Sequence, residues 1–449
     1  MTSFRSSSML PSFRVLATYA VLTFFVLFFV LSGFNSHLSG TLSHLTTGFA
    51  NGFPDFSKYI DVETLTEHDF PLDDERKRVI LVGDIHGRYD DLQRLLGKVS
   101  YDSSSDTLIS VGDIIAKGPH TGSMQVLHFM ASNNITAVRG NHDEKVIEWR
   151  TWINWIHSIP KGRQWLLQTT DKWIEYQNNR GRDESDVDEW VAKQMKQDRG
   201  NKKWWKKIPD GWQLFGDHYE IASAMSDEEY KYMVSRPLRI HAPSAHTFIV
   251  HAGVLASDPK RDPWDKRQPL ATIPKVPHAV NNDVVLDKTG LLRRLQELAV
   301  LSKVPQNLDP WVTLNMRGVR KSGKVTRGKD GTPWADLYNE DMYRCKGFSE
   351  PVSKRKKNSL PCQPATVIYG HAASRGLDIN RWTLGLDSGC VYKRRMTALV
   401  LGGKYASKNF SEDEESDEEG VFDIDGNRVK SVVHFGDDGK GKLYSVSCS

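Results

Sequence analysis

Short apolar runs that end in glycine and a polar cluster recur along this chain. The clearest run covers residues 79–82 and leads into Gly-Asp84-Ile-His86-Gly. An apolar run closed by glycine indicates a buried strand that ends in a tight turn. This turn would present Asp84 and His86 at the C-terminal edge of the strand. A carboxylate beside an imidazole suits Zn, Mn or Fe rather than Mg alone.

Helical patterns separate the apolar runs. We expect strands at 79–83, 107–111 and 135–138, with helices at 90–97 and 121–131 between them. We expect further strands at 246–251 and 366–371, each ending in a histidine, and short strands between 383 and 401. Strands that alternate with helices at this spacing predict parallel pairing and an α/β layered fold.

The region 144–235 interrupts this alternation with a helical insertion. Nine of the 13 tryptophans fall between Trp149 and Trp212. We interpret them as the core of a helical cap rather than as an aromatic binding platform. The lysines around Trp204 and Trp205 fit either a solvated face or the rim of a site for an extended polyanion.

Charge and cysteine content narrow the class of protein. The formal net charge is only +4, because basic runs at 317–329 and 354–357 are offset by an acidic run at 411–419. We expect the basic runs to be solvated loops, the acidic run to be disordered, and no nucleic acid partner. The four cysteines have no CxxC spacing, which excludes a zinc finger and leaves one or two disulfides in an oxidising compartment open.

The N-terminus carries a targeting signal. Residues 15–34 contain no charge and are long enough to cross a bilayer, and Arg5 and Arg14 precede them. By the positive-inside rule the protein is a single-pass type II membrane protein, and a cleaved signal peptide is the alternative. The glycosylation pattern occurs at Asn409, expected to be accessible, and at Asn134, expected in the core. The expected divisions are a cytosolic N-terminus 1–14, a transmembrane anchor 15–34, a stalk 35–75, a catalytic domain 76–405, and an acidic tail with a short hairpin at 406–449.

Seven polar residues follow the same strand-end pattern, which points to one site. They are Asp84, His86, Asp113, Asn141, His142, His251 and His371. The ends of parallel strands meet at one sheet edge. We therefore expect one divalent ion on Asp84, His86 and Asp113. A second would lie on Asp113, Asn141, His251 and His371. Two such ions clamp an in-line displacement and activate a water molecule as the nucleophile.

These motifs, in this order, resemble those of the calcineurin-like metallophosphoesterases, in the branch of serine/threonine phosphatases and bacterial diadenosine tetraphosphatases. The resemblance implies a sandwich of two mixed β-sheets flanked by helices, and a His142 that protonates the leaving oxygen. Where the protein phosphatases carry Asp-Arg, this chain has Ala116-Lys117, so it lacks the carboxylate that would orient His142. The candidate substrate contacts are Lys117, Arg139, Arg236 and Arg239.

The anchor, the Ala-Lys variant and the basic insertions resemble the fungal vacuolar endopolyphosphatases of this superfamily. This implies hydrolysis of internal phosphoanhydride bonds of polyphosphate by a lumenal domain at the vacuole membrane. Zinc is the first choice of metal, before Mn, Co, Fe or Mg. Two alternatives stay open: a dinucleoside polyphosphate hydrolase or serine/threonine protein phosphatase, and a non-catalytic phosphate-binding pseudo-phosphatase.

Overall fold

The computed structural model describes residues 49–50, 53–56, 58–180, 187–276, 287–349, 358–403 and 420–449. The chain divides into two compact units, residues 1–58 and 59–449. The described part of the first unit is a hairpin of β1 (Phe49–Ala50) and β2 (Phe53–Pro54). The expected anchor 15–34 lies outside the described residues. No described helix combines the length and the apolar character that crossing a bilayer requires.

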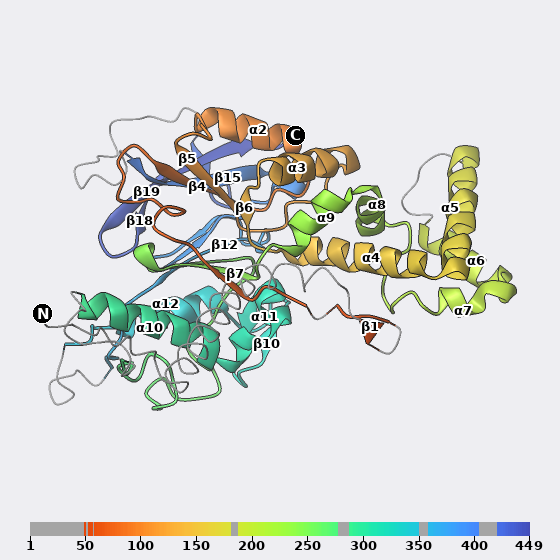
Figure 1. The fold of residues 1–449 in the computed structure, drawn as a ribbon. Coiled ribbons are helices and arrows are strands. Elements are labelled where there is room, and N and C mark those ends of the chain that lie inside the picture. Colours follow the sequence, from red (N-terminus) through yellow and green to blue (C-terminus); the bar gives the residue numbers. More distant parts are fainter. Residues whose placement is uncertain are drawn as a thin grey trace, which may run out of the picture. The chain divides into compact units, whose positions relative to one another are not determined.

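One six-stranded sheet of the second unit contains the predicted alternation (Figure 1). Its strands, in spatial order, are β18 (Val432–Phe435), β19 (Gly439–Ser447), β15 (Arg395–Gly402), β4 (Arg78–Val82), β5 (Asp106–Ser110) and β6 (Thr136–Ala137). β4, β5 and β6 are parallel and are joined by α2 (Tyr89–Lys98) and α3 (His120–Ser132), as predicted. The remaining pairings are antiparallel, so the sheet is mixed.

The other six-stranded sheet is also mixed. Its strands, in spatial order, are β13 (Asp378–Ile379), β14 (Thr383–Gly385), β12 (Thr366–Tyr369), β8 (Thr247–Val250), β7 (Arg239–Ala242) and β3 (Val62–Thr64). β12 pairs in parallel with both β14 and β8, and β3 pairs in parallel with β7. β7 and β8 are antiparallel, as are β13 and β14.

The two sheets share a core because their strands alternate between two buried faces. Val79 and Leu81 of β4 pack in one cluster with Ile249 of β8 and Ile368 of β12. The intervening Phe248 and Val250 point to the opposite face of the sheet. The architecture of two mixed sheets with flanking helices agrees with the predicted fold class.

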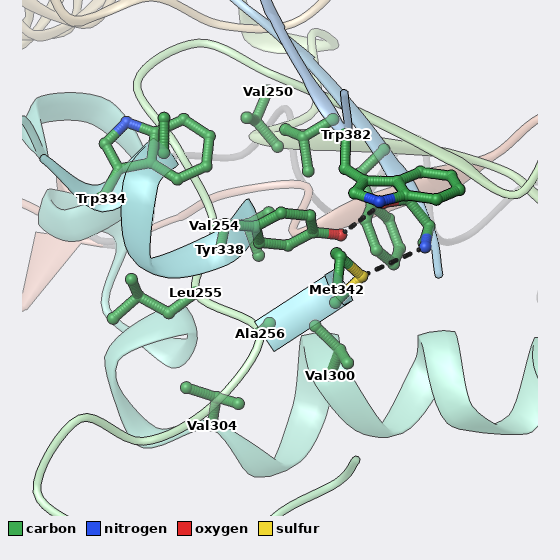
Figure 2. Packing of buried hydrophobic residues seen from close by; sticks show 14 of the residues in the cluster. Val250, Val254, Leu255, Ala256, Val300, Val304, Trp334, Tyr338, Met342 and Trp382 are labelled. Atoms are coloured by element: carbon green, nitrogen blue, oxygen red, sulfur yellow. Dashed lines mark hydrogen bonds between the residues drawn. The ribbon is translucent and has the colours of Figure 1, made fainter. Parts of the chain in front are cut away.

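The opposite face of the second sheet is covered by α10 (Lys288–Lys303) and α12 (Trp334–Arg344). Figure 2 shows Trp334, Tyr338 and Met342 of α12 gathered against the strands in this cluster. The hydroxyl of Tyr338 donates to the carbonyl of Ala365 at 3.0 Å, so the buried phenol is satisfied. This packing holds the strand that precedes His371.

The limits of the folded domain differ from the predicted ones. β3 lies in the predicted stalk, and β18 and β19 lie in the predicted tail, yet all three belong to the sandwich. β3 is only three residues long and has no periodic pattern, so only its pairing with β7 reveals it. β16 (Val421–Phe422) and β17 (Arg428–Val429) form a small separate hairpin. The acidic run 411–419 lies outside the described residues.

The insertion consists of helices, as predicted. They are α4 (Asn141–Ser158), α5 (Pro160–Arg180), α6 (Val187–Gln197), η2 (Arg199–Asn201), α7 (Lys202–Trp205), α8 (Asp217–Ala224) and α9 (Asp227–Val234). In Figure 1, α4 runs away from the sheets, and α5, α6 and α7 gather around its far end. Eight of the nine insertion tryptophans are at most 5% exposed, so they form the core of a cap. Trp212 is half-buried.

The remaining elements lie between the strands of the second sheet and after it. They are η3 (Pro243–Ala245), η4 (Pro305–Leu308), α11 (Pro310–Asn315), β9 (Gly318–Val319), β10 (Val325–Thr326), β11 (Thr332–Pro333) and η6 (Cys390–Tyr392). β9 and β10 lie within the basic run 317–329 and form a small antiparallel sheet with β11, so this run is not wholly a solvated loop. The run 354–357 lies outside the described residues.

Two further features decide open points from the sequence. All four cysteines form disulfides, Cys345 with Cys362 and Cys390 with Cys448.

Asn134 is exposed after α3, so the expectation that it lies in the core is wrong. Its short polar side chain suits the left-handed φ of 45° at this turn. Asn409 lies outside the described residues.

Candidate metal centre

The strand ends of both sheets bring the six predicted metal ligands together. Asp84 and His86 follow β4, Asp113 follows β5, and Asn141 begins α4 after β6. His251 follows β8 and His371 follows β12 in the second sheet. All six are at most 8% exposed. The site therefore lies where the C-terminal ends of parallel strands from two sheets meet.

Two groups of donor atoms share one carboxylate. Donor atoms of Asp84, His86 and Asp113 lie within 4.8 Å of one another, and so do those of Asp113, His251 and His371. His251 Nε2 is 3.3 Å from Asp113 Oδ2 and 3.2 Å from Asn141 Oδ1, which adds Asn141 to the second group. This arrangement matches the predicted sorting, with Asp113 between the two positions.

Backbone carbonyls orient two of the histidines. His86 Nδ1 lies 3.1 Å from the carbonyl of Ala116, and His251 Nδ1 lies 3.0 Å from that of Val111. A carbonyl only accepts, so each Nδ1 carries a proton, and Nε2 is the nitrogen through which each ring could bind a metal. Both Nε2 atoms lie toward Asp113 Oδ2, at 3.7 Å for His86 and 3.3 Å for His251, and a fixed ring of this kind suits a metal ligand.

The donor set fits divalent cations. His371 Nε2 is buried without a hydrogen-bond partner. The pKa of Asp84 is raised well above its usual value, first because the carboxyl is buried and then because Asp387 and Asp113 lie close. Crowded buried carboxylates with an unpartnered imidazole nitrogen are stabilised by a cation between them. A mixed imidazole and carboxylate set suits Zn, Mn or Fe.

The backbone around the site adopts conformations that few residues tolerate. His86, Asp113 and His371 all have positive φ, between 48° and 68°. A Cβ at Gly140 would overlap Asp113 Oδ1, and one at Gly370 would overlap Asp84 Oδ1. Such strain clusters at functional sites because the surrounding structure must hold it in place.

His142 has a partner that the sequence did not reveal. Its backbone N–H donates to Asp113 Oδ1 at 2.9 Å, and its Nδ1 lies 2.9 Å from Nε2 of His218 on α8. The two rings are nearly parallel, with an interplanar angle of 11°. Burial lowers the pKa of His142 to about 3, and Asp113 opposes this shift only in part. His218 thus lies where the carboxylate missing at Ala116 would act.

Two further residues lie at the site, although neither was among the candidate site residues predicted from the sequence. Asp387 is buried beside Asp84, in the Gly385-Leu-Asp387 stretch after β14. Arg317 Nη2 donates to the carbonyl of His371 at 3.0 Å, which places this guanidinium next to the cluster. The motif around Asp387 was visible in the sequence. Arg317 was hidden in a basic run that reads as solvated.

The predicted substrate contacts have mixed outcomes. Lys117 is exposed, its backbone N–H donates to Asp217 Oδ2 at 2.6 Å, and its charge acts on His142. Arg139 pairs with Glu144 at 2.8 Å. This buried ion pair indicates that Arg139 stabilises the fold.

The other two arginines are also engaged within the protein. Arg236 donates to the carbonyl of Ile135 at 3.1 Å and stacks on the ring of Tyr232. Arg239 is 1% exposed and donates to Asp61 and to the carbonyl of Leu301. The structure does not support Arg139, Arg236 and Arg239 as substrate contacts, because none of them lines a pocket beside the cluster.

Two pockets flank the cluster. The first, which we call the aromatic pocket, has a volume of about 490 Å³. It contains Asn141, His142 and His218, and its rings come from Tyr59, Trp149, Trp212 and Trp311. The second, the cationic pocket, has a volume of about 280 Å³. Its charged lining residues are Arg317, Arg327, Lys329 and Arg394. Arg327 lines both pockets, so they are neighbours.

Comparison with known proteins agrees with this site. Residues 77–251 match the family model of the calcineurin-like phosphoesterases. The matched region runs from β4 to His251 and is similar to the calcineurin-like phosphoesterases, and it includes all the candidate metal ligands except His371.

Curated relatives cover a smaller part. A symmetrical bis(5'-nucleosyl)-tetraphosphatase of Klebsiella pneumoniae (strain 342) is 48% identical over 65 residues, 14% of this chain and 22% of that protein. The protein of the same name from Baumannia cicadellinicola subsp. Homalodisca coagulata is 40% identical over 107 residues, 21% of this chain and 35% of that protein. The chain thus spans at most about a third of the length of these two relatives.

A solved structure of a protein serine/threonine phosphatase from Saccharomyces cerevisiae aligns with 88% of this chain and 85% of its own. It has 12% sequence identity and a TM-score of 0.34. A TM-score this low carries no argument about function.

Proposed function

We propose that this protein is a metal-dependent hydrolase that cleaves internal phosphoanhydride bonds of inorganic polyphosphate. The cationic pocket beside the shared-carboxylate cluster carries this proposal. Arg317, Arg327, Lys329 and Arg394 line this pocket, and Arg317 also donates to the carbonyl of His371. Its described lining residues include no carboxylate.

The chain's own residues define roles in the reaction. Asp84, His86, Asp113, Asn141, His251 and His371 would hold two divalent ions, zinc being the first choice. Such ions, when bound, make water a nucleophile at neutral pH and neutralise charge on the phosphoryl oxygens. Arg317 would bind oxygens of the attacked phosphate through its planar guanidinium. His142 would stabilise the leaving oxygen through the proton on Nε2.

Electrostatics favour a polyanion over an isolated monoester. The pKa of Arg317 lies below its usual value, first because the guanidinium is half-buried and then because Arg327 lies close. A chain with about one negative charge per phosphate unit would relieve the repulsion between these two cations. Binding of this kind depends steeply on salt, because counterions are released.

A gel assay with long-chain polyphosphate tests the proposal. The full chain is stripped with a chelator and reloaded with Zn, Mn, Co or Mg. We expect the whole ladder to shorten without early release of monophosphate, and only with added metal. An untouched ladder under every metal rejects polyphosphate as the substrate, and release of monophosphate from the ends rejects internal cleavage.

Neutralising the cationic pocket sharpens the assay. The triple variant Arg327→Gln, Lys329→Gln, Arg394→Gln should raise the KM for long chains at least about tenfold and flatten its salt dependence. Turnover of a small aryl phosphate should stay within about threefold of the parent. The matched control replaces three cap lysines, Lys202, Lys203 and Lys206, with Gln. Equal losses in the two triple variants would contradict a specific role for the pocket.

The aromatic pocket supports a second candidate, hydrolysis of dinucleoside polyphosphates. Trp311 is 45% exposed at this pocket, and a planar base stacks well on an exposed ring. The curated relatives carry the name of such an activity. Trp311→Ala should then raise the KM for diadenosine tetraphosphate and leave that for polyphosphate unchanged. Turnover of the dinucleotide with no cleavage of polyphosphate would favour this candidate.

We further propose that the catalytic domain faces the lumen of the vacuole, anchored by residues 15–34. The two disulfides support an oxidising compartment, since they are rare in the cytosol. The exposed Asn134 offers a test, because only a lumenal domain meets the glycosylation machinery. A glycosidase should shift the mobility of the parent protein, and less so that of Asn134→Gln. Protease digestion of the domain in intact vacuoles would contradict this topology.

A further inference from the structure

The pairing of His142 with His218 has a chemical consequence that a carboxylate partner would not have. A carboxylate only accepts hydrogen bonds, so it would hold a proton on His142 Nδ1. An imidazole either donates or accepts, according to its tautomer. Nε2 of His218 lies 2.9 Å from Nδ1 of His142, so one of these two nitrogens carries the shared proton.

Two N–H groups cannot face each other at 2.9 Å, so at least one of the two facing nitrogens has no proton and its ring is neutral. A neutral imidazole carries a single proton, either on Nδ1 or on Nε2. The partner of Nδ1 therefore decides whether His142 presents a proton or a lone pair at Nε2.

The surroundings of His218 support a fixed position. His218 lies in the first turn of α8, and Asp217 of the same turn accepts the backbone N–H of Lys117 at 2.6 Å. This contact ties the insertion to the loop that carries Ala116. Tyr219 of α8 packs edge-on against Trp149 of α4, the helix that carries His142.

We propose that His218 is a positioning residue that donates its Nε2–H to His142 Nδ1 and so holds His142 as its Nε2–H tautomer. His142 then offers a hydrogen bond to the leaving oxygen as a neutral imidazole. A neutral histidine can serve as such an electrophile. This inference rests on the proposed function only in giving His142 a role toward the leaving group.

Histidine ¹⁵N NMR of the full chain, loaded with diamagnetic zinc, tests the tautomer directly. We expect the His142 resonance, assigned through His142→Gln, to have the Nε2–H pattern in the parent protein. In His218→Ala we expect a mixture of both tautomers. An Nδ1–H pattern in the parent protein would overturn the proposal, and so would an unchanged pattern in the variant. This readout does not depend on the substrate.

A double-mutant cycle tests whether His218 acts through His142. On a small phosphoester with a poor leaving group, His218→Ala should lower kcat about ten- to a hundredfold with little change in KM. The double variant with His142→Ala should be no slower than His142→Ala alone, because the two residues act as a unit. Losses that multiply would assign His218 a separate structural role and overturn the proposal.

Two controls keep the outcomes distinct. His157→Ala makes the same change in an exposed histidine at the end of α4 and should leave kcat within about twofold. His218→Gln retains a donor on a side chain of similar length and should recover part of the activity if His218→Ala loses structure. If the parent turns over no phosphate substrate, the proposed function fails, and the tautomer measurement still decides the role of His218.

Discussion

Two buried clusters of histidine and carboxylate in this protein use the same residue types for different ends. In the candidate metal centre, Asp84, Asp113 and Asp387 crowd around four imidazoles. In the second cluster, the single carboxylate of Glu297 binds His241 Nε2 at 2.7 Å and His246 Nδ1 at 2.8 Å. Each oxygen of Glu297 thus has an imidazole partner.

The balance of charge separates the two clusters. Each contains a buried ring nitrogen without a hydrogen-bond partner, His371 Nε2 in one and His241 Nδ1 in the other, so that feature does not distinguish them. The metal centre has an excess of carboxylates, which favours a cation. The second cluster has one carboxylate, Glu297, which has two imidazole partners, and Arg293 Nε lies 3.8 Å from Glu297 Oε1. An excess of buried carboxylates therefore marks the cluster in which a metal ion would bind.

Removing the shared carboxylate should produce the largest effect. Asp113→Asn removes the negative charge and one of the two carboxylate oxygens that the donor groups share, and metals supply several kcal/mol of transition-state stabilisation. We expect kcat to fall at least about 10³-fold. Mass spectrometry should show a lower metal content than in the parent protein. Glu297→Gln is the matched control and should keep its metal. An Asp113→Asn protein with full activity would refute the shared site.

The second cluster should respond in stability instead. Glu297→Ala leaves the buried His241 and the half-buried His246 without their carboxylate, while Arg293 keeps Asp437, and should lower the free energy of unfolding by about 3 kcal/mol. Denaturant unfolding with the disulfides intact measures this change. Metal content should equal that of the parent. Loss of metal together with stability would mean that the two clusters are not independent.

Arg317 and Arg239 should differ in the same way, with smaller effects on KM and on stability. Arg317→Lys should raise the KM for polyphosphate about tenfold, because lysine offers no planar fork, and leave stability nearly unchanged. Arg239→Lys should leave the KM unchanged and lower stability by about 1 kcal/mol, since its buried contacts to Asp61 and Leu301 need the guanidinium. The reverse assignment in steady-state kinetics and unfolding would restore the original prediction for Arg239.

The smallest expected effect is a dependence of stability on pH. Burial raises the pKa of Glu297, but the hydrogen bonds from His241 and His246 outweigh it and leave that pKa below its usual value. Its stabilising contribution is then complete above the unfolded-state pKa and is lost as pH falls through the folded-state pKa. The difference in stability between the parent and Glu297→Gln should shrink as the pH falls from 7 into the acid range. A constant difference would contradict this linkage.

Several parts of the site could be predicted because each motif is local. The apolar run and turn at Asp84 and His86 predict the end of a strand. Apolar runs also precede the other candidate ligands, which are Asp113, Asn141, His251 and His371. Parallel strands carry their C-terminal ends to one edge, so convergence follows from the pattern. The α/β class followed from the alternation of strands and helices, whereas the sandwich of two mixed sheets followed from the family resemblance.

Contacts between distant segments could not be predicted in this way. β3 has three residues and no period, and it exists because β7 offers an edge. β18 and β19 were assigned to a tail, yet they extend the sheet beside β15. Arg139, Arg236 and Arg239 had the right charge for phosphate, but their acceptors come from other segments of the fold.

Short repeated patterns in the sequence predicted an α/β layered fold, the place of the cap and the candidate metal ligands, and the family resemblance added the two mixed sheets. The contact of His218 with His142 across 76 residues of chain, the place of Arg317 beside His371 and the pairing of Glu297 with His241 become visible only in the folded structure. Pairing across such distances is set by packing of the whole core, so it cannot be predicted from a local sequence pattern.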